Sequence, residues 1–117
     1  MQSIGLVADP VFEEHDTGPG HPETPSRLAR IRAMLEASGL GQRAVRVEPE
    51  SASDETLARV HDLEHIRRVD ATHDSGAHFL DSMDVAVSPA TARVARLAAG
   101  SLVALCRKEP WPRVTTR

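Results

Sequence analysis

Two short apolar runs separated by one helical pattern constrain the fold of this chain more than any other feature. Residues 3–8 read SIGLVA and residues 44–48 read AVRVE, and both are typical of short strands. Between them, Thr24 is a suitable N-cap with Pro25 at the first helical position, and Gly39 ends the predicted helix. Strand, helix and strand within about 45 residues predict a βαβ unit with parallel strands and a right-handed crossover.

The remaining elements are predicted to be helical. Leu28, Ile31 and Leu35 share one face of the first helix, since they follow an i, i+3, i+7 spacing. Further helices are expected over residues 53–60, over 63–70, and from the Ser88-Pro89 cap to about residue 107, while 9–24 and 71–87 are expected to be irregular.

This layout of two strands and four helices is incomplete for an α/β protein. A parallel sheet is normally covered on both faces and rarely stops at two strands. We therefore expect residues 1–107 to form the opening part of a larger parallel-sheet domain. Residues 108–117 contain two prolines around Trp111 and no hydrophobic period, and they are expected to be an unpatterned tail.

Composition excludes several functional classes. A formal net charge of -3 over 117 residues leaves no basic footprint for nucleic acid. No apolar run approaches the roughly 18 residues of a membrane span, and the N-terminus lacks the pattern of a signal peptide. The single cysteine, Cys106, excludes an internal disulfide and is expected to be a small core residue. These features favour a cytoplasmic protein that binds neither nucleic acid nor membrane.

Three clusters of polar residues are candidates for chemistry. The loop from His15 to Glu23 carries two imidazoles and several carboxylates, which suit a metal or polar ligand, although turns and backbone hydrogen bonds explain such a loop more simply. His61, Glu64 and His65 match the inverted zinc-protease pattern but lack an evident third ligand, so helix-entry and surface roles are favoured. The third cluster is read as a solvated loop and consists of Asp70, His73, Asp74, His78, Asp81 and Asp84.

Taken in order, three blocks of the sequence resemble a known family. The blocks are HDTGPGHPETPSRLARI, SASDETLARVHDLEHIRRV and GAHFLDSMDVAVSPATARVARLAAG, within about residues 4–105. Their succession resembles the N-terminal part of the histone deacetylase superfamily. The resemblance is strongest to the bacterial branch of acetoin-utilisation and acetylpolyamine amidohydrolases.

The resemblance implies an arginase/deacetylase-like α/β fold and a zinc-dependent hydrolysis of acetyl-lysine or of acetylated amines such as polyamines. Carried over by motif, His21 and Glu23 would lie at the rim of the active-site mouth, and Arg27 would lie near an internal channel. Asp84 would be the rim aspartate that binds the backbone of a peptide substrate, although Val85 departs from the usual threonine.

The groups that perform the hydrolysis in this family have no counterpart in the sequence. The general-base histidine pair and the zinc-binding residues lie further along the chain in the family, but here no histidine follows His78 and no aspartate follows Asp84. We therefore expect no catalytic residue, no metal ligand and no cofactor in this chain. The favoured hypothesis is an N-terminal deacetylase fragment that is inactive alone. A split enzyme completed by another chain, or a non-catalytic binding module whose acidic loops attract a cationic ligand, are the alternatives.

Overall fold

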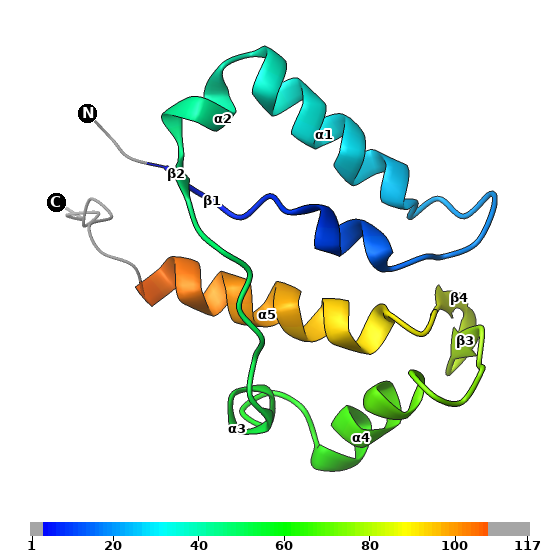
Figure 1. Cartoon of the computed structure of the whole chain (residues 1–117). Helices are drawn as coiled ribbons and strands as arrows, with labels where there is room; N and C mark the ends of the chain where they lie inside the picture. Colours follow the sequence, from blue (N-terminus) through cyan, green and yellow to red (C-terminus); the bar gives the residue numbers. More distant parts are fainter. Residues whose placement is uncertain (1–3, 108–117) are drawn as a thin grey trace, which may run out of the picture.

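A computed structural model describes residues 4–107 of the chain (Figure 1). The strands β1 (Gly5–Leu6) and β2 (Val45–Arg46) pair in parallel, with Gly5 opposite Val45. The backbone N–H of Val45 donates to the Ile4 carbonyl at 2.8 Å, and that of Val47 donates to the Leu6 carbonyl at 2.9 Å. The predicted βαβ unit is therefore confirmed, although both strands are shorter than the apolar runs that predicted them.

The crossover between these strands contains α1 (Pro25–Ala37) and the single-turn helix α2 (Leu40–Arg43). The Thr24 hydroxyl oxygen accepts from the backbone N–H of Ser26, and Pro25 occupies the first helical position, as the sequence predicted. Gly39 has a φ of 75°, so it stops α1 in the left-handed region that glycine tolerates best. The helix α2 was not predicted, because four residues carry too little periodicity to be recognised.

Three further helices lie where helices were predicted, although the first of them is shorter than the predicted 53–60. Ser53 caps α3 (Asp54–Leu57) by accepting from the backbone N–H of Thr56 at 3.2 Å. Helix α4 (Leu63–Ala71) follows directly, and α5 (Thr91–Arg107) is the longest helix of the described chain, with 17 residues.

The two segments that were expected to be irregular both contain structure. Residues 71–87 include a hairpin of β3 (Phe79–Leu80) and β4 (Ser82–Ala86), so the expectation there was wrong. Its turn residue Asp81 has a φ of 63°, a conformation that aspartate adopts more readily than most residues. Polar residues within the hairpin hid the strand signal. The loop after β1 contains the 3-10 helix η1 (Pro10–Glu14), which begins at an Asp9 cap.

The core forms where α5 crosses the segment after β2. Gly100 allows this crossing, because a Cβ there would lie only 2.5 Å from the Ala52 nitrogen and 2.6 Å from the Ser51 carbonyl carbon. Cys106 is exposed, which corrects its expected core position, since it lies one turn after the exposed Leu102 on the same side of α5. The buried apolar residues are mostly small or β-branched: Val47, Ala52, Ile66, Ala86, Val87, Ala92, Val94 and Ala104.

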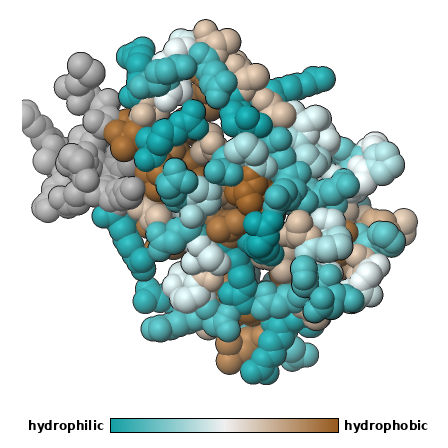
Figure 2. Space-filling model, viewed as in Figure 1, coloured by the Kyte–Doolittle hydropathy of each residue, from teal (hydrophilic) through white to brown (hydrophobic). Residues whose placement is uncertain are grey.

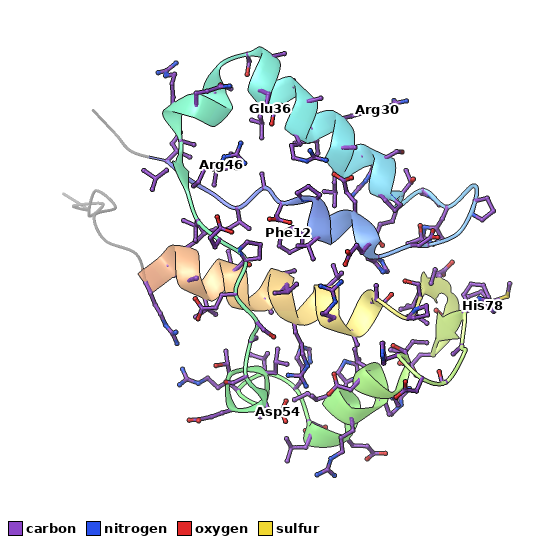
Figure 3. The ribbon with its side chains drawn as sticks, viewed as in Figure 1. Phe12, Arg30, Glu36, Arg46, Asp54 and His78 are labelled. Carbon is purple, nitrogen blue, oxygen red and sulfur yellow. The ribbon has the colours of Figure 1, made fainter. Side chains whose placement is uncertain are left out.

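The elements form an open arrangement in which α1 and α5 flank the segment from β1 to η1 (Figure 1). Figure 3 shows Phe12 of η1 between the two helices, whereas Arg30 points away from them. Figure 2 shows apolar residues at the surface between α1 and α5 in the same view. No helix in the described part of the chain is long and apolar enough to cross a membrane.

Candidate functional site

The loop that follows β1 is attached to the start of α5. His15 Nδ1 and Thr91 Oγ1 share a hydrogen bond of 2.8 Å, and the backbone N–H of Asp16 donates to Ser88 Oγ at 3.2 Å. The Thr91 hydroxyl also accepts from the backbone N–H of Ser88 at 2.7 Å. Segments more than 70 positions apart in the sequence are thereby held together, so the loop has a defined position above the helix end.

Within this loop, His21 and Glu23 have local partners. His21 Nδ1 accepts from the backbone N–H of Glu23 at 3.1 Å, which places the ring proton on Nε2 when the imidazole is neutral. The Thr17 hydroxyl donates to the Glu23 carbonyl. These bonds leave the Glu23 carboxylate exposed and His21 half-buried. The rim positions expected of these two residues are therefore compatible with a ligand contact.

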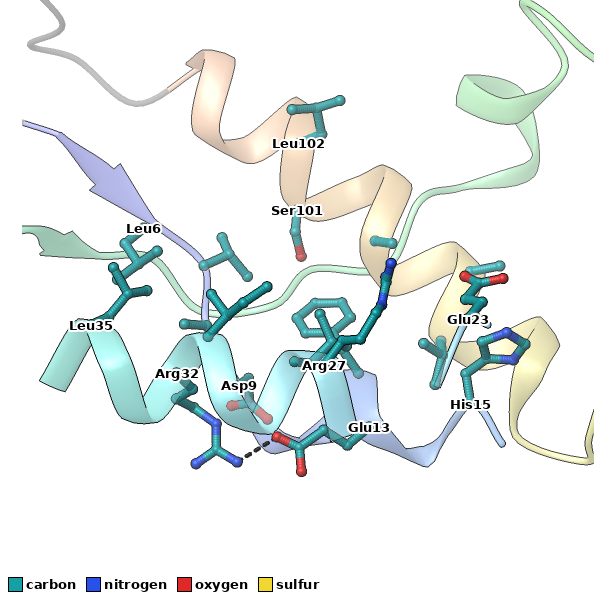
Figure 4. Close-up of a pocket in the computed structure, with 18 of the residues that line it drawn as sticks. Leu6, Asp9, Glu13, His15, Glu23, Arg27, Arg32, Leu35, Ser101 and Leu102 are labelled. Atoms are coloured by element: carbon teal, nitrogen blue, oxygen red, sulfur yellow. Dashed lines mark hydrogen bonds and ion pairs between the residues drawn. The ribbon is translucent and has the colours of Figure 1, made fainter. Parts of the chain in front are cut away.

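A cavity of about 690 Å³ lies between α1 and α5. Its floor is formed by β1 and η1, and its two ends differ in chemistry. Leu6 and Leu35 lie at one end, and His15 and Glu23 lie at the other, with Arg27 reaching in between the helices (Figure 4). The cavity is mainly apolar and carries a few charged groups, which is the pattern of a ligand pocket in which polar groups fix the orientation.

Arg27 has no ion pair among residues 4–107, although its guanidinium points into this cavity (Figure 4). The nearby Arg32, by contrast, is bonded to Glu13, which raises the pKa of Arg32. Arg27 therefore offers five unmatched N–H donors to whatever occupies the cavity. The helical pattern alone does not separate these two arginines, because both lie on the same helix, and only the family motif singled out Arg27.

A second cavity of about 650 Å³ lies between the loop after η1 and the β3–β4 hairpin. Its walls come from residues 16–19, 76–79 and 87–89. Asp84 lies on β4 and is exposed, but it lines neither of these two cavities. The structure thus brings Glu23 and Arg27 to one cavity and leaves His21 and Asp84 outside both.

The acidic loops that could attract a cationic ligand carry four carboxylates, those of Glu13, Glu14, Asp81 and Asp84, and three of these are paired with arginine. Glu13 pairs with Arg32, and Glu14 pairs with Arg93. Asp81 likewise pairs with an arginine of α4. Only Asp84 of these four carboxylates has no arginine partner in the described structure. The described structure therefore gives little support to a binding module in which acidic loops attract a cationic ligand.

The third polar cluster also has structural roles. Asp70 accepts from Arg96 Nε at 3.0 Å and from its Nη2 at 2.6 Å, and this bidentate bond lowers the pKa of Asp70. Arg96 also reaches Asp54 at 2.7 Å and the Ala52 carbonyl at 3.2 Å, so it joins α5 to α3 and α4. Sequence reasoning missed Arg96, because no local pattern marks a bond between residues so far apart.

The candidate metal ligands do not converge. The rings of His61 and His65 lie with centroids 5.0 Å apart, and His73 Nδ1 is hydrogen-bonded to the Pro89 carbonyl at 2.7 Å. Across the described residues, no group of three His, Cys, Asp or Glu side chains is placed to hold a metal ion. The residues present therefore do not fit a catalytic zinc, which takes three protein ligands.

Comparison with known proteins links this architecture to one family. The family description "Histone deacetylase domain" matches residues 21–109. The chain is 36% identical over 85 residues to the histone deacetylase-like amidohydrolase of Pseudomonas aeruginosa, covering 73% of this chain and 22% of the relative. It is 32% identical over 118 residues to histone deacetylase 5 of Arabidopsis thaliana, covering 92% of this chain and 18% of the relative.

The fold agrees with these matches. The crystal structure of the HDA15 HD domain superposes with a TM-score of 0.75 at 31% sequence identity, and the match covers 85% of this chain and 29% of that one. The chain thus spans about a fifth of the length of the two relatives named above, and its helices and parallel strands correspond to part of an α/β deacetylase domain. On these grounds, the chain belongs to the histone deacetylase family.

Proposed function

We propose that this chain supplies the N-terminal part of a zinc-dependent deacetylase that hydrolyses the amide of acetyl-lysine or of similar acetylated amines, and that it does not hydrolyse them alone. The observation that carries the proposal is the family match over residues 21–109 in a chain that spans 22% and 18% of two relatives. In this proposal residues 1–107 form the deacetylase part and residues 108–117 a tail, and the protein acts in the cytoplasm.

The roles proposed for the four site residues come from the family resemblance, and their positions support them. Asp84 is exposed on β4, where its carboxylate accepts backbone N–H groups of a peptide substrate at the mouth. His21 and Glu23 form part of the rim, and the hydrogen bonds within their loop support this role by fixing its shape. Arg27 presents its guanidinium to the cavity between α1 and α5, where it binds an anion or carbonyl oxygen.

In this proposal, zinc is bound by the complete deacetylase domain and not by this chain alone. In the family it activates water and polarises the acetyl carbonyl. The described residues of this chain do not fit it, since no three candidate ligands converge. The proposal therefore assigns substrate positioning to this chain and assigns the zinc ligands and the proton-transferring groups to the rest of a deacetylase domain.

A chimera tests this assignment directly. The matched 85 residues of the Pseudomonas aeruginosa amidohydrolase are replaced by the matching residues of this chain, and the unmodified relative is the control. The chimera is expected to bind zinc and to hydrolyse an acetyl-lysine peptide or an acetylated polyamine. The isolated chain is expected to do neither. A chimera that folds and binds zinc but hydrolyses no acetylated substrate contradicts the proposal, as does one tightly bound zinc per isolated chain.

Asp84→Ala in the chimera separates substrate positioning from a general defect. Loss of a charge-assisted hydrogen bond of about 1.5–3 kcal/mol predicts an increase in KM of roughly ten-fold or more for a peptide, with kcat little changed. Asp74→Ala is the matched control, because Asp74 is an exposed carboxylate with 92% side-chain exposure outside both cavities. Equal effects of the two substitutions would remove Asp84 from the proposed site.

A further inference from the structure

Asp84 lies in a bulge of β4, and strand pairing does not fix the position of this bulge. In the described hairpin, Ser82 and Ala86 have partners in β3, whereas residues 83–85 between them have none. A bulge leaves its residues unpaired and turns a side chain into a new direction. The direction of the Asp84 carboxylate therefore depends on what holds the two ends of the bulge.

The end of the bulge that leads to α5 is held by burial. Ala86 and Val87 are both buried and belong to the core. The backbone N–H of Val87 donates to the His78 carbonyl at 2.9 Å, which closes the base of the hairpin. This end of the bulge therefore keeps its place as long as the core around the start of α5 stays packed.

The other end of the bulge is the turn at Asp81, which lies at the surface with 53% of its side chain exposed. Asp81 is the one non-glycine residue with a positive φ in the described chain, and this conformation is strained for a residue with a Cβ. A hairpin of two such short strands is also marginally stable without further contacts. The turn therefore needs a contact from outside the hairpin to keep its position.

Arg68 provides this contact. It lies in the last turn of α4 and forms an ion pair with the Asp81 carboxylate, and Figure 1 shows the hairpin close to the end of this helix. Among residues 4–107, no other hydrogen bond or ion pair joins residues 80–85 to a part of the chain outside the hairpin. The carbonyl end of a helix favours a cation and repels a carboxylate. Without the Arg68 guanidinium, the Asp81 carboxylate would therefore be repelled from α4.

We propose that Arg68 is a positioning residue for substrate binding. Its ion pair with Asp81 fixes the turn of the hairpin, and the turn in turn directs the carboxylate of Asp84, three residues further along β4. Arg68 itself does not touch the substrate. This inference rests on the proposed function, in which Asp84 accepts backbone N–H groups of a peptide. It therefore predicts that Arg68 matters for peptide substrates and not for small acetylated amines that lack a peptide backbone.

Kinetics of the chimera test this role. Arg68→Ala is expected to raise the KM for an acetyl-lysine peptide about two- to five-fold with kcat little changed, as loss of an exposed ion pair predicts. Arg68→Lys keeps the positive charge and should recover most of the peptide KM. Arg67→Ala is the matched control, because Arg67 is an exposed arginine of the same helix without an ion pair in the described chain. Equal KM values for Arg68→Ala and Arg67→Ala overturn the proposal.

The choice of substrate separates positioning from a general defect. N-butylacetamide reproduces the acetylated side chain of lysine without a peptide backbone. Its kcat/KM is expected to be the same for Arg68→Ala as for Arg67→Ala, because no backbone N–H group is present to bind Asp84. A loss of the same size for this compound and for the peptide would mean that Arg68 acts on the whole fold, and it would overturn the proposal.

A double-mutant cycle tests whether the ion pair is the route. Asp81→Asn removes the negative charge and keeps a residue that tolerates the left-handed conformation of the turn. It is expected to raise the peptide KM as much as Arg68→Ala does. The double variant should be no worse than either single variant, because the two residues act through one contact. Increases in KM that multiply in the double variant overturn the assigned route.

Backbone 15N relaxation of the chain itself gives a measurement that needs no activity. Arg68→Ala is expected to lower the order parameters of residues 81–85 and to leave those of α5 unchanged, whereas Arg67→Ala should change neither. Unchanged order at residues 81–85 overturns the proposal, whatever the kinetics show.

The inference and the proposed function fail in different ways. If Asp84→Ala leaves the peptide KM unchanged, the proposed role of Asp84 is refuted and the role of Arg68 is refuted with it. If Asp84→Ala raises the peptide KM and Arg68→Ala does not, the role of Arg68 alone is refuted.

Discussion

Gly100→Ala tests whether the crossing of α5 over the segment after β2 holds the core together. A Cβ at position 100 would lie 2.5 Å from the Ala52 nitrogen and 2.6 Å from the Ser51 carbonyl carbon, and it would be closer still to the Glu50 oxygen. All three are backbone atoms, so no side-chain rotation relieves the overlap. The helix and the segment must move apart, which threatens the bond from the Glu50 N–H to Ser101 Oγ.

The magnitude follows from two opposing effects. Alanine in a helix interior is favoured over glycine by about 1 kcal/mol, because glycine loses more backbone entropy on folding. Overpacking a core position costs about 1–3 kcal/mol, and contact with rigid backbone places Gly100 toward the upper part of that range. We expect a net loss of about 1–2 kcal/mol in the free energy of unfolding.

Urea unfolding followed by circular dichroism at 222 nm measures this change as a shift in the midpoint at constant slope. Gly41→Ala in α2 is the matched control, because the nearest atom to its added Cβ is the Leu35 carbonyl oxygen at an ordinary 3.5 Å. That variant is expected to be neutral or more stable by up to about 1 kcal/mol. If Gly100→Ala raises the midpoint as the control does, the close crossing and the core built on it are refuted.

Three further results are expected from the described contacts. Arg96→Lys loses the bidentate bond to Asp70 and the contact with Asp54, so it should lower the midpoint of urea unfolding. Arg93→Lys, at a more exposed ion pair, is the control and should leave the midpoint unchanged. Equal midpoints for the two variants contradict the assigned role of Arg96. The pKa of Asp70 is lowered by Arg96, so its contribution to stability is complete above the ordinary value of 3.8 and is lost as the pH falls through the lowered value. The wild type should therefore lose more stability than Asp70→Asn in acid unfolding below about pH 4, and parallel acid transitions would argue against it. Thr24→Ala removes the side-chain cap of α1 and should cost about 1 kcal/mol in urea unfolding, which Thr24→Ser should largely restore.

Local patterns were enough to predict most of the regular elements. The cap at Thr24, the stop at Gly39 and the cap at Ser53 each act within one helical turn, so neighbouring residues suffice to predict them. The parallel pairing of β1 with β2 also followed from sequence, because a helix between two apolar runs leaves few other connections. The family resemblance, based on three ordered blocks, was confirmed by the match over residues 21–109.

The hairpin of β3 and β4 shows where local reasoning failed. Its strands are short and carry exposed charge, and its register depends on a left-handed Asp81 rather than on a hydrophobic alternation. The expected core position of Cys106 was wrong for a related reason, since Cys106 lies on the same side of α5 as the exposed Leu102, and the sequence does not show which side of the helix is covered. Neither feature can be derived from residues adjacent in the sequence.

By itself the sequence determined the positions of most helices, the parallel strand pair and the family, because each depends on nearby residues or on ordered motifs. The tertiary structure decided which of the arginines on one helix form ion pairs. Arg32 is bonded to Glu13 and Arg27 faces an apolar cavity without an ion pair in the described chain, although both lie on α1. It also decided that the apolar stripe of α1 stays exposed, since burial depends on which surface lies opposite the helix and a helical pattern does not specify that surface.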